Sequence, residues 1–326
     1  MIMKWIIILF GLIKIHALQL FHAARIRQSS RPRKEPQCLR LLHGPSQHGR
    51  EVLQAYENGD HAMIIPRGVT LKIALDLNNG VADASSERSE RFTCPSSLDL
   101  VHRLRKCSHA VLVGRGTVQQ DNCTLTVRRV PPEAVECFIN GVQSKKVVQP
   151  TRIVIDPGLK LIQSHDENQY AILNDSYETI VYHALSDGEI LTKGLQSKIL
   201  QLPENVLLVR ATTQYGTGEL FDIRQEKTLS PQHILDDLNA RGKMHIMVEG
   251  GPETAKIFLQ NHSVDRAIII RAPLHFKEPI PSGITDEILG QAGLTRLGTR
   301  LCGVDTVEYW TRDGLVWPSP SLQSWP

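Results

Sequence analysis

A strand-to-helix turn near residue 249 constrains the fold of this chain more than any other feature. The apolar run from Met244 to Val248 is typical of a buried strand, and it ends at Glu249, Gly250 and Gly251. A helix then begins with Pro252 in its first turn, where the first N–H groups of a helix lack partners anyway. Glycines let amides approach a ligand closely, and a helix N-terminus favours phosphate oxygens. The pattern predicts a ligand site at the carboxyl end of a strand, although a tight turn with a surface glutamate has the same sequence.

A second turn of the same kind follows the apolar run Ala110–Val113. It reads Gly114-Arg115-Gly116-Thr117, and the threonine can donate from both its hydroxyl and its amide. The guanidinium of Arg115 offers a planar pair of donors that suits phosphate. Two such turns in one sheet fit a dinucleotide, and the extra arginine suits a 2′-phosphate, which favours NADP over NAD. A standard Rossmann domain is not expected, because no G-x-G-x-x-G fingerprint is present.

Strand-like and helix-like segments alternate through most of the chain. Strands are predicted at Thr70–Leu75, Arg152–Ile155, Thr179–His183, Val206–Arg210 and Val264–Arg271, and helices at Pro231–Ala240, at Glu253–Asn261 and from an N-cap at Ser96. This alternation predicts a mostly parallel sheet with helices on both faces. Thr295–Trp310 looks like strands without an intervening helix, as at an antiparallel edge. Pro131–Gln149 and Lys277–Gln291 are expected to be long surface loops.

Three charged residues near the second turn are candidates for ligand contacts. Asp121 could hydrogen-bond the hydroxyl groups of a ribose, and Arg128 could hold an anionic group of a substrate. Arg105, at the end of the helix before the strand, is a candidate second phosphate clamp. A basic residue at that end of a helix is also a common partner of the helix dipole.

The first 34 residues have the composition of a targeting leader. They contain no Asp or Glu, and Lys4 precedes an apolar run from Trp5 to Ile15 that an Arg- and Ser-rich stretch follows. A membrane span needs roughly 20 apolar residues, so the short run is more typical of a signal peptide. A signal peptide followed by a transit-like segment resembles the two-part plastid address of algae whose plastids lie inside extra membranes, with Phe21 near the cleavage motif. The alternatives are an ordinary secreted protein and a single-pass anchor.

Charge and cysteine usage exclude several classes of partner. The formal charge is +3, and removing the seven basic residues of the leader leaves −4, so nucleic acid is not expected as a partner and neither is a membrane after leader removal. The six cysteines show no C-x-x-C and no Cys/His pair at zinc spacing. They predict free thiols in a reducing compartment and no metal site. The residues after the leader suffice for one large α/β domain.

An ordered set of segments carries a family resemblance. The set is Leu71-Lys72-Ile73-Ala74, Val101–Arg105, Ser108–Gly114, Gly116–Val118, Asp121, Leu125–Arg128, Arg152–Asp156 and Val248–Pro252. It resembles the reductase domain of the riboflavin-biosynthesis deaminase–reductase family. The resemblance implies a dihydrofolate-reductase-like α/β fold and reduction by NADPH of 5-amino-6-(5-phosphoribosylamino)uracil to its ribitylamino counterpart. Together with the composition of the leader, it predicts four segments: a targeting leader at 1–36, an N-terminal extension at 37–69, the reductase domain at 70–318 and a tail at 319–326.

The turns and the resemblance together assign expected roles to individual residues. Expected cofactor contacts are Gly114, Arg115, Thr117, Asp121, Gly250, Gly251, Pro252, Glu253, Thr254, Ala255, Lys256 and Ile257. Expected substrate contacts are Ser89, Arg105, Leu125, Arg128 and Glu249. Arg105 and Arg128 would hold the sugar phosphate, and Glu249 would accept hydrogen bonds from the aminouracil. Lys72 and Glu249 are the expected catalytic residues, with Lys72 either a proton donor or an edge residue with a solvated tip.

The chain departs from the family pattern in three places. The usual Ser-Leu-Asp-Gly after the first strand reads Asp76-Leu77-Asn78-Asn79, and Arg91 or Phe92 replaces a tryptophan expected near the cofactor. The usual Asp-Asp-Pro turn reads Asp121-Asn122-Cys123. These changes keep two alternatives open, which are another dihydrofolate-reductase-like reductase and a non-catalytic binding partner of a pathway enzyme. No P-C-x-x-C motif is present to hold a deaminase zinc, so a separate deaminase is expected. A homodimer is possible, since relatives of this fold commonly dimerise.

Overall fold

The fold is described from a computed structural model of the chain. It describes residues 67–85, 91–132, 134–139, 142–164, 169–215, 227–319, 322 and 325–326. These residues all belong to one compact unit, Pro45–Pro326. The predicted leader, most of the predicted N-terminal extension and Ser89 lie outside the described residues.

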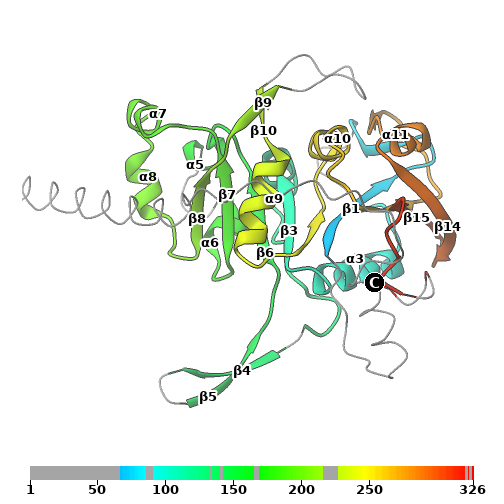
Figure 1. Ribbon diagram of the computed structural model, residues 1–326, viewed down its shortest axis with the longest axis horizontal. Coiled ribbons are helices and arrows are strands. Elements are labelled where there is room, and N and C mark those ends of the chain that lie inside the picture. The colour runs from blue at the N-terminus through cyan, green and yellow to red at the C-terminus, as the bar shows by residue number, and fades with distance from the viewer. Residues whose placement is uncertain are drawn as a thin grey trace, which may run out of the picture. The chain divides into compact units, whose positions relative to one another are not determined.

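A nine-stranded sheet forms the centre of this unit (Figure 1). Its order is β14 (Leu294–Cys302), β15 (Asp305–Arg312), β12 (Arg266–Arg271), β1 (Gly68–Leu75), β11 (His245–Val248), β3 (Ala110–Gly114), β6 (Thr151–Ile155), β7 (Thr179–His183) and β8 (Val206–Arg210). All neighbours from β12 to β8 run parallel, whereas β15 is antiparallel to both β12 and β14. The predicted parallel sheet with an antiparallel C-terminal edge is therefore confirmed.

Helices cover both faces of the sheet, as the alternation of segments predicts. They are α3 (Pro95–Lys106), α4 (Arg115–Asp121), α5 (Lys160–Gln163), α6 (Ala171–Asn174), α7 (Asp187–Thr192), α8 (Gln196–Gln201), α9 (Pro231–Ala240), α10 (Pro252–Gln260) and α11 (Asp286–Gln291). Apolar residues of α9, α10 and α11 pack in one core cluster, and those of α3 to α8 pack in a second.

The strands supply alternate side chains to these two cores. In β3, Ala110 and Leu112 belong to the core under α9 and α10, and Val111 and Val113 belong to the core under α3. Because successive side chains of a strand point to opposite faces, a strand buried on both sides has a continuous apolar sequence. This is why the apolar runs of the sequence located the strands well.

Both segments predicted as long loops contain regular structure. Residues 131–149 include the antiparallel pair β4 (Ala134–Ile139) and β5 (Val142–Val147), which stands apart from the central sheet in Figure 1. The sequence between the two strands is Asn140-Gly141, a strong signal for a tight hairpin that the loop prediction overlooked. Residues 277–291 include β13 (Pro279–Pro281) and α11.

Two further short pairs complete the strands of the described residues. β13 pairs with β2 (Gly80–Asp83), which directly follows the first strand of the domain. β9 (Thr213–Tyr215) pairs with β10 (Lys227–Leu229). The pairing of β2 with β13 brings the loop after β1 against a segment about 200 residues later in the chain.

The predicted N-cap of α3 at Ser96 is wrong. The helix begins at Pro95, its N-cap is Cys94, and no side chain of the cap residue accepts a hydrogen bond from the first turn. Instead, the buried carboxylate of Asp305 accepts the Cys94 N–H at 2.8 Å. A group on β15 thus accepts the N–H of the N-cap residue itself, which is not one of the first-turn donors that an N-cap side chain binds.

Residues at the end of the predicted tail pack against the domain. Trp325 is buried, and its ring centroid lies 5.1 Å from that of Trp317 and 5.8 Å from that of His245. No helix in the part of the chain that the structure describes is both long and apolar enough to cross a membrane.

Candidate active site

The carboxyl ends of β1, β11 and β3 meet at one edge of the sheet. β11 pairs in parallel with both β1 and β3, so Glu249, Lys72 and Gly114 are brought to the same edge. A cavity of about 340 Å³ opens there, within the usual range for small-molecule sites. Its lining residues are Lys72, Ile73, Ala74, Val81, Ala82, Phe92, Gly114, Gly116, Thr117, Gln120, Asp121, Glu249, Gly250, Gly251, Pro252, Glu253 and Thr254.

The two glycine-rich turns contact each other directly. The hydroxyl of Thr117 accepts the backbone N–H of Gly251 at 3.1 Å. A Cβ atom at Gly114 would lie 2.4 Å from Thr254 Oγ1, and one at Gly250 would lie 2.7 Å from Thr254 Cβ. These two glycines are needed for the close packing of α10 against β3, whereas the sequence analysis expected them to clear space for phosphate.

The N-terminus of α10 faces the cavity. Its N-cap is Gly251, which has no side chain to cap the first turn, and Pro252 follows. Glu253 forms an ion pair with Lys256 at 3.1 Å, so its charge is partly offset. First-turn amides without a local cap, at the positive end of a helix, form an anion-binding position.

Arg115 lies beside this position but does not line the cavity. Its Nη1 donates to Gln119 Oε1 at 2.8 Å, and its Nε lies 3.8 Å from Asp156 Oδ1. Asp156 is fully buried, and burial raises the pKa of its carboxyl. In this structure Arg115 therefore pairs with Gln119 on α4 and with Asp156, which directly follows β6, and it is not among the residues that line the cavity.

Arg105, which does not itself line the cavity, forms a bidentate ion pair with the cavity residue Glu249. Arg105 Nε donates to Glu249 Oε2 and Arg105 Nη2 donates to Glu249 Oε1, each at 2.8 Å. The Nζ of Lys72 lies 3.8 Å from Glu249 Oε1. The side chains of Arg105, Glu249 and Lys72 are 9%, 13% and 15% exposed, so all three charges are largely removed from water.

The charges of this group shift one another's pKa. Burial by itself raises the pKa of Glu249, but Arg105 and Lys72 outweigh burial and hold that pKa below its ordinary value. Burial lowers the pKa of Lys72, and the attraction of Glu249 only partly opposes it. Glu249 is thus an ionised acceptor, and Lys72 is a stronger acid than an ordinary lysine.

Arg105 is fixed from a second side by the segment after α4. Its Nη1 donates to Thr126 O at 3.0 Å, so three of its five N–H donors bind protein groups. The neighbouring Leu125 is buried and has a left-handed φ of 54°. The guanidinium thus orients Glu249, and the expected contact of Arg105 with the sugar phosphate stays a prediction.

Arg128 and His102 adjoin the same group. The Arg128 backbone N–H donates to His102 Nδ1 at 3.0 Å, which requires that nitrogen to be unprotonated. Burial and the charges of Arg105 and Arg128 lower the pKa of His102 to about 4. The Arg128 side chain is exposed, and it is not among the residues that line the cavity.

Several predicted contacts lie away from the cavity. Ala255 is buried in the core, and Lys256, Ile257 and Leu125 do not line the cavity either. Six other residues line the cavity without having been predicted as site residues: Ile73, Ala74, Val81, Ala82, Gly116 and Gln120. Ile73 and Ala74 could have been predicted, because they follow the expected site residue Lys72 on the same strand. Val81 and Ala82 arrive through the β2–β13 pairing, for which the sequence gives no local signal.

The altered loop after β1 keeps a well-defined turn. The carboxylate of Asp76 accepts from the backbone N–H of Asn78 at 2.8 Å, of Gly80 at 2.7 Å and of Phe276 at 3.0 Å. Asn79, at the position of the family glycine, has a φ of 61°. Asparagine is one of the few other residues that tolerate this left-handed conformation. The altered sequence thus still allows a left-handed residue at position 79.

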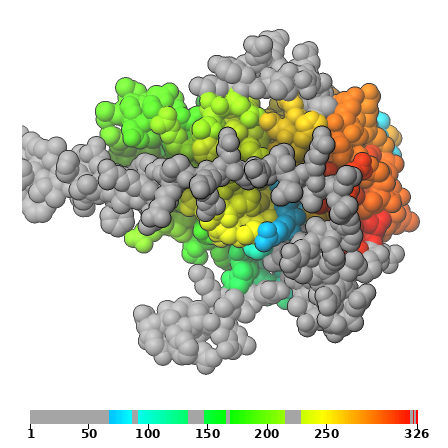
Figure 2. Space-filling model, viewed as in Figure 1, coloured from blue at the N-terminus to red at the C-terminus, as the bar shows by residue number. Residues whose placement is uncertain are grey.

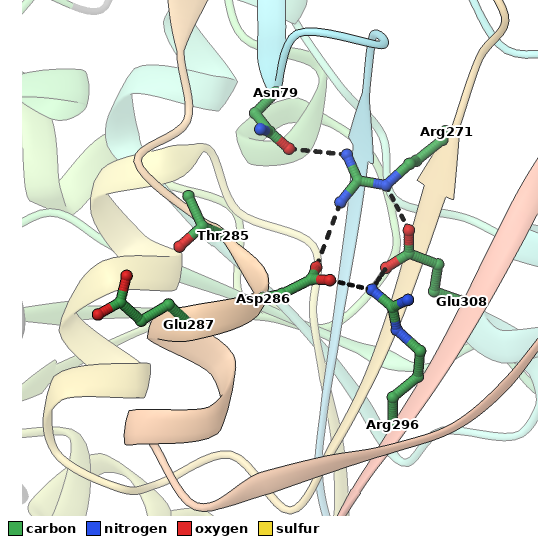
Figure 3. Close-up of a pocket in the computed structure, with 7 residues that line it drawn as sticks. All are labelled: Asn79, Arg271, Thr285, Asp286, Glu287, Arg296 and Glu308. Atoms are coloured by element: carbon green, nitrogen blue, oxygen red, sulfur yellow. Dashed lines mark hydrogen bonds and ion pairs between the residues drawn. The ribbon is translucent and has the colours of Figure 1, made fainter.

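A polar pocket of about 500 Å³ holds this turn from the other side (Figure 3). Arg271 Nη1 donates to Asn79 Oδ1 at 2.7 Å, and Arg271 also forms a short ion pair with Glu308. Figure 3 shows Asp286 and Arg296 closing a ring of charges around Arg271 and Glu308. Four of its lining side chains, Arg271, Asp286, Arg296 and Glu308, form ion pairs with one another, so we interpret the pocket as support for the loop after β1.

No metal centre is formed by the described side chains. Within the described ranges, no group of three or more His, Cys, Asp and Glu side chains is arranged to hold a metal ion.

Comparison with known proteins gives consistent matches. Residues 67–297 match the family model described as RibD C-terminal domain. The chain is 30% identical over 215 residues to the riboflavin biosynthesis protein RibD of Aquifex aeolicus, covering 66% of this chain and 49% of that protein. It is 27% identical over 206 residues to the 2,5-diamino-6-ribosylamino-4(3H)-pyrimidinone 5′-phosphate reductase of Archaeoglobus fulgidus, covering 63% of this chain and 80% of that protein.

The fold comparison agrees with the sequence matches. The structure of Acinetobacter baumannii RibD (form 2) has a TM-score of 0.52 at 20% identity, with 81% of this chain and 62% of that chain covered. The chain spans about half of the length of the Aquifex aeolicus relative, so the match concerns part of that protein.

Proposed function

The chain belongs to the RibD C-terminal domain family, and on that premise we propose that it is an NADPH-dependent reductase of riboflavin biosynthesis. It would convert the ribosyl group of 5-amino-6-(5-phosphoribosylamino)uracil to a ribityl group. The observation that carries the proposal is that Lys72 and Glu249, which Arg105 binds, line one cavity together with the joined glycine turns.

The residues present fit a dinucleotide cofactor. Thr117, Asp121 and Gly116 line one side of the cavity, and the uncapped N-terminus of α10 lines the other. Thr117 and the α10 amides would hold phosphate groups, and Asp121 would bind ribose hydroxyls. Arg115 would supply charge for a 2′-phosphate after leaving Gln119 and Asp156.

The protein's own groups would orient the substrate and move one proton. The cofactor would supply a hydride to C1′ of the ring-opened imine. Glu249, ionised and held by Arg105, can only accept hydrogen bonds, so it would select the N–H donors of the pyrimidine. Lys72, with its lowered pKa, would donate a proton to the imine nitrogen. Positioning two bound reactants can account for roughly 7–11 kcal/mol of a barrier.

The amino-substituted pyrimidinone is a second candidate substrate. The Archaeoglobus fulgidus relative is named for reduction of that compound, and this chain covers 80% of that relative. The two compounds differ by a deamination, which a separate enzyme would perform before or after the reduction. Both carry the same phosphorylated sugar, so the site described above would serve either.

The test is oxidation of NADPH by the purified protein with each pyrimidine in turn. We expect turnover with at least one, and its near-complete loss in Glu249→Gln and in Lys72→Met. Glu204→Gln is the matched control, because Glu204 is exposed on the loop after α8 and distant in sequence from every site residue. NADPH binding without turnover on either compound would point to a different reductase. A folded protein that does not bind NADPH would support the non-catalytic relative.

We also propose that residues 1–36 direct the protein to a plastid and that the protein forms a homodimer. The acid-free, Arg- and Ser-rich sequence of the leader supports the first proposal. A fluorescent protein fused behind residues 1–36 should accumulate in the plastid of an alga with complex plastids, and secretion would contradict the proposal. Light scattering on the purified protein tests the dimer.

A further inference from the structure

Part of the cavity lining is apolar and comes from three segments of the chain. Ile73 and Ala74 belong to β1, Val81 and Ala82 belong to β2, and Phe92 lies just before α3. We call these five residues the apolar wall. Apolar side chains are the usual packing surface for the flat rings of a ligand. The position of the apolar wall therefore matters for the proposed reaction, in which two rings have to meet in a defined orientation.

The carboxylate of Asp76 joins two segments behind this wall. Asp76 directly follows the last residue of β1, and its side chain is fully buried. Its Oδ1 accepts the backbone N–H groups of Asn78 at 2.8 Å and of Gly80 at 2.7 Å, which belong to the turn into β2. Its Oδ2 accepts the backbone N–H of Phe276 at 3.0 Å, 200 residues further along the chain. Each oxygen of the carboxylate thus holds a different segment.

Phe276 transmits this connection to the cavity. Its ring packs edge-on against the ring of Phe92, with ring centroids 5.0 Å apart. The turn after β1 also packs closely on Phe276, because a Cβ atom at Gly80 would lie 3.1 Å from Phe276 Cδ2. Phe276 is not among the residues that line the cavity, whereas Phe92 is. The Asp76 carboxylate therefore acts on the apolar wall only through other residues.

We propose that Asp76 is a positioning residue of the active site, which holds Phe92 and β2 where they orient the rings of substrate and cofactor. The inference rests on the proposed function. The β2–β13 pairing joins the same two segments between Gly80 and Asp83, and Asp76 joins them where the chain leaves β1. The proposal also explains the departure from the family pattern at position 76. The usual serine has one side-chain oxygen, whereas a carboxylate has the second oxygen that the bond to Phe276 uses.

Asp76→Asn tests the connection between the segments without removing the turn. The asparagine oxygen can still accept from Asn78 and Gly80, but its NH₂ group would then face the Phe276 N–H, so that two donors oppose each other. We expect kcat to fall roughly 10- to 100-fold, because a misplacement of about 1 Å can have an effect of that size. KM for NADPH should stay within about threefold, because the glycine turns are unchanged.

Phe276→Leu tests the second step of the connection. It removes the ring contact with Phe92 but keeps the backbone N–H that Asp76 binds. We expect a loss of kcat similar to that of Asp76→Asn. Because both changes act through the same contact, the double variant should be no slower than the slower single variant. Losses of kcat that multiply in the double variant would contradict the proposal.

Asp265→Asn is the matched control. Asp265 Oδ2 accepts the Val69 N–H at 2.8 Å at the opposite end of β1, so the same chemical change is made away from the cavity. Its kcat should stay within about twofold of wild type. Adenosine 2′,5′-bisphosphate, which has phosphates of the cofactor but no nicotinamide, should bind Asp76→Asn and wild type with affinities within about twofold.

Three outcomes would overturn the proposal. The first is a kcat in Asp76→Asn equal to that of wild type. The second is an equal loss of kcat in Asp265→Asn, which would mean that any weakening of β1 slows the reaction. The third is a large loss of affinity for adenosine 2′,5′-bisphosphate in Asp76→Asn, which would mean that the whole cavity is disturbed.

Hydrogen exchange separates this proposal from the proposed function, because it needs no turnover. In Asp76→Asn the Phe276 amide should exchange at least about tenfold faster than in wild type, and the Asn78 and Gly80 amides should stay within about twofold. If this result were found in a protein that reduces neither pyrimidine, the proposed function would be wrong and the connection through Asp76 would stand. Unchanged exchange at Phe276 would show that Asp76 does not hold this segment.

Discussion

The hydroxyl of Thr117 accepts the backbone N–H of Gly251 across 3.1 Å, and this bond ties the first glycine turn to the second. Thr117 belongs to α4 and Gly251 is the N-cap of α10. The bond therefore fixes the distance between the two helix starts that would hold the cofactor phosphates. We therefore expect loss of this hydrogen bond to weaken binding of the cofactor.

Thr117→Val should weaken NADPH binding by roughly tenfold, because one hydrogen bond and one potential phosphate donor are lost while the shape is kept. Fluorescence titration of NADPH measures the effect. Thr192→Val is the control, since the Thr192 hydroxyl donates only to Glu189 O on the exposed α7. An unchanged NADPH affinity in Thr117→Val would show that the turn-to-turn bond is not part of the cofactor site.

Removing only one partner of the Arg105–Glu249 pair should lower the free energy of unfolding much more than replacing both partners with apolar residues. Arg105→Met leaves the Glu249 charge buried without its bidentate partner, and the expected loss in unfolding free energy is roughly 3–5 kcal/mol. The double variant Arg105→Met/Glu249→Leu should regain most of this stability and have no activity. Urea denaturation of the two single variants and the double variant measures the coupling. Additive losses would mean that the two side chains do not depend on each other.

His245 should make the protein sensitive to mild acid. It is fully buried, its ring nitrogens contact Thr70 Oγ1 at 2.9 Å and Cys107 O at 2.6 Å, and burial lowers its pKa from 6.5 to about 3. The unfolded chain binds the proton more readily than the folded one, so stability is highest above pH 6.5 and falls as pH drops toward 3. Unfolding free energy measured across this range should have a smaller slope in His245→Gln. If the pH dependence of the unfolding free energy were the same in His245→Gln as in wild type, groups other than His245 would cause the acid sensitivity.

Glycine and alanine at position 79 should differ in their effect on the stability of the protein. Asn79 has a φ of 61° and bonds Arg271 at 2.7 Å. Asn79→Gly relaxes the backbone but loses the bond, so a loss of about 1 kcal/mol is expected. Asn79→Ala loses the bond and adds backbone strain, for a total of about 2–3 kcal/mol. Thermal unfolding of both variants gives the order, and an alanine variant as stable as the glycine variant would contradict the role of the left-handed turn.

Much of the fold follows from local sequence. The run Ala110–Val113 was recognisable as a strand because all four side chains are apolar and both faces of β3 are covered. The turn at Glu249 marked the end of β11 because two glycines and a proline follow it. Hydrophobic pattern and turn chemistry act over a few residues, so a single sequence reveals them.

The ion-pair and hydrogen-bond partners of the charged residues could not be predicted from local sequence. The sequence placed Arg105 and Glu249 in one site but assigned them to different parts of the substrate, and the structure joins them to each other. The N-cap of α3 was expected at Ser96, but the N-cap is Cys94, and its N–H is bound by Asp305 on β15. The sequence shows that an arginine can form an ion pair, but it does not show which of several carboxylates will be its partner in the folded chain.

The sequence by itself determined the parallel sheet, its two glycine turns and the edge of the sheet at which the site lies. Those features depend on apolar periodicity and on residues with special backbone preferences, which are local properties. Only the folded structure shows that Glu249 is bound by Arg105 and that Arg115 turns to Gln119. Pairing of buried charges depends on distances between segments far apart in the chain, and those distances exist only after the sheet has formed.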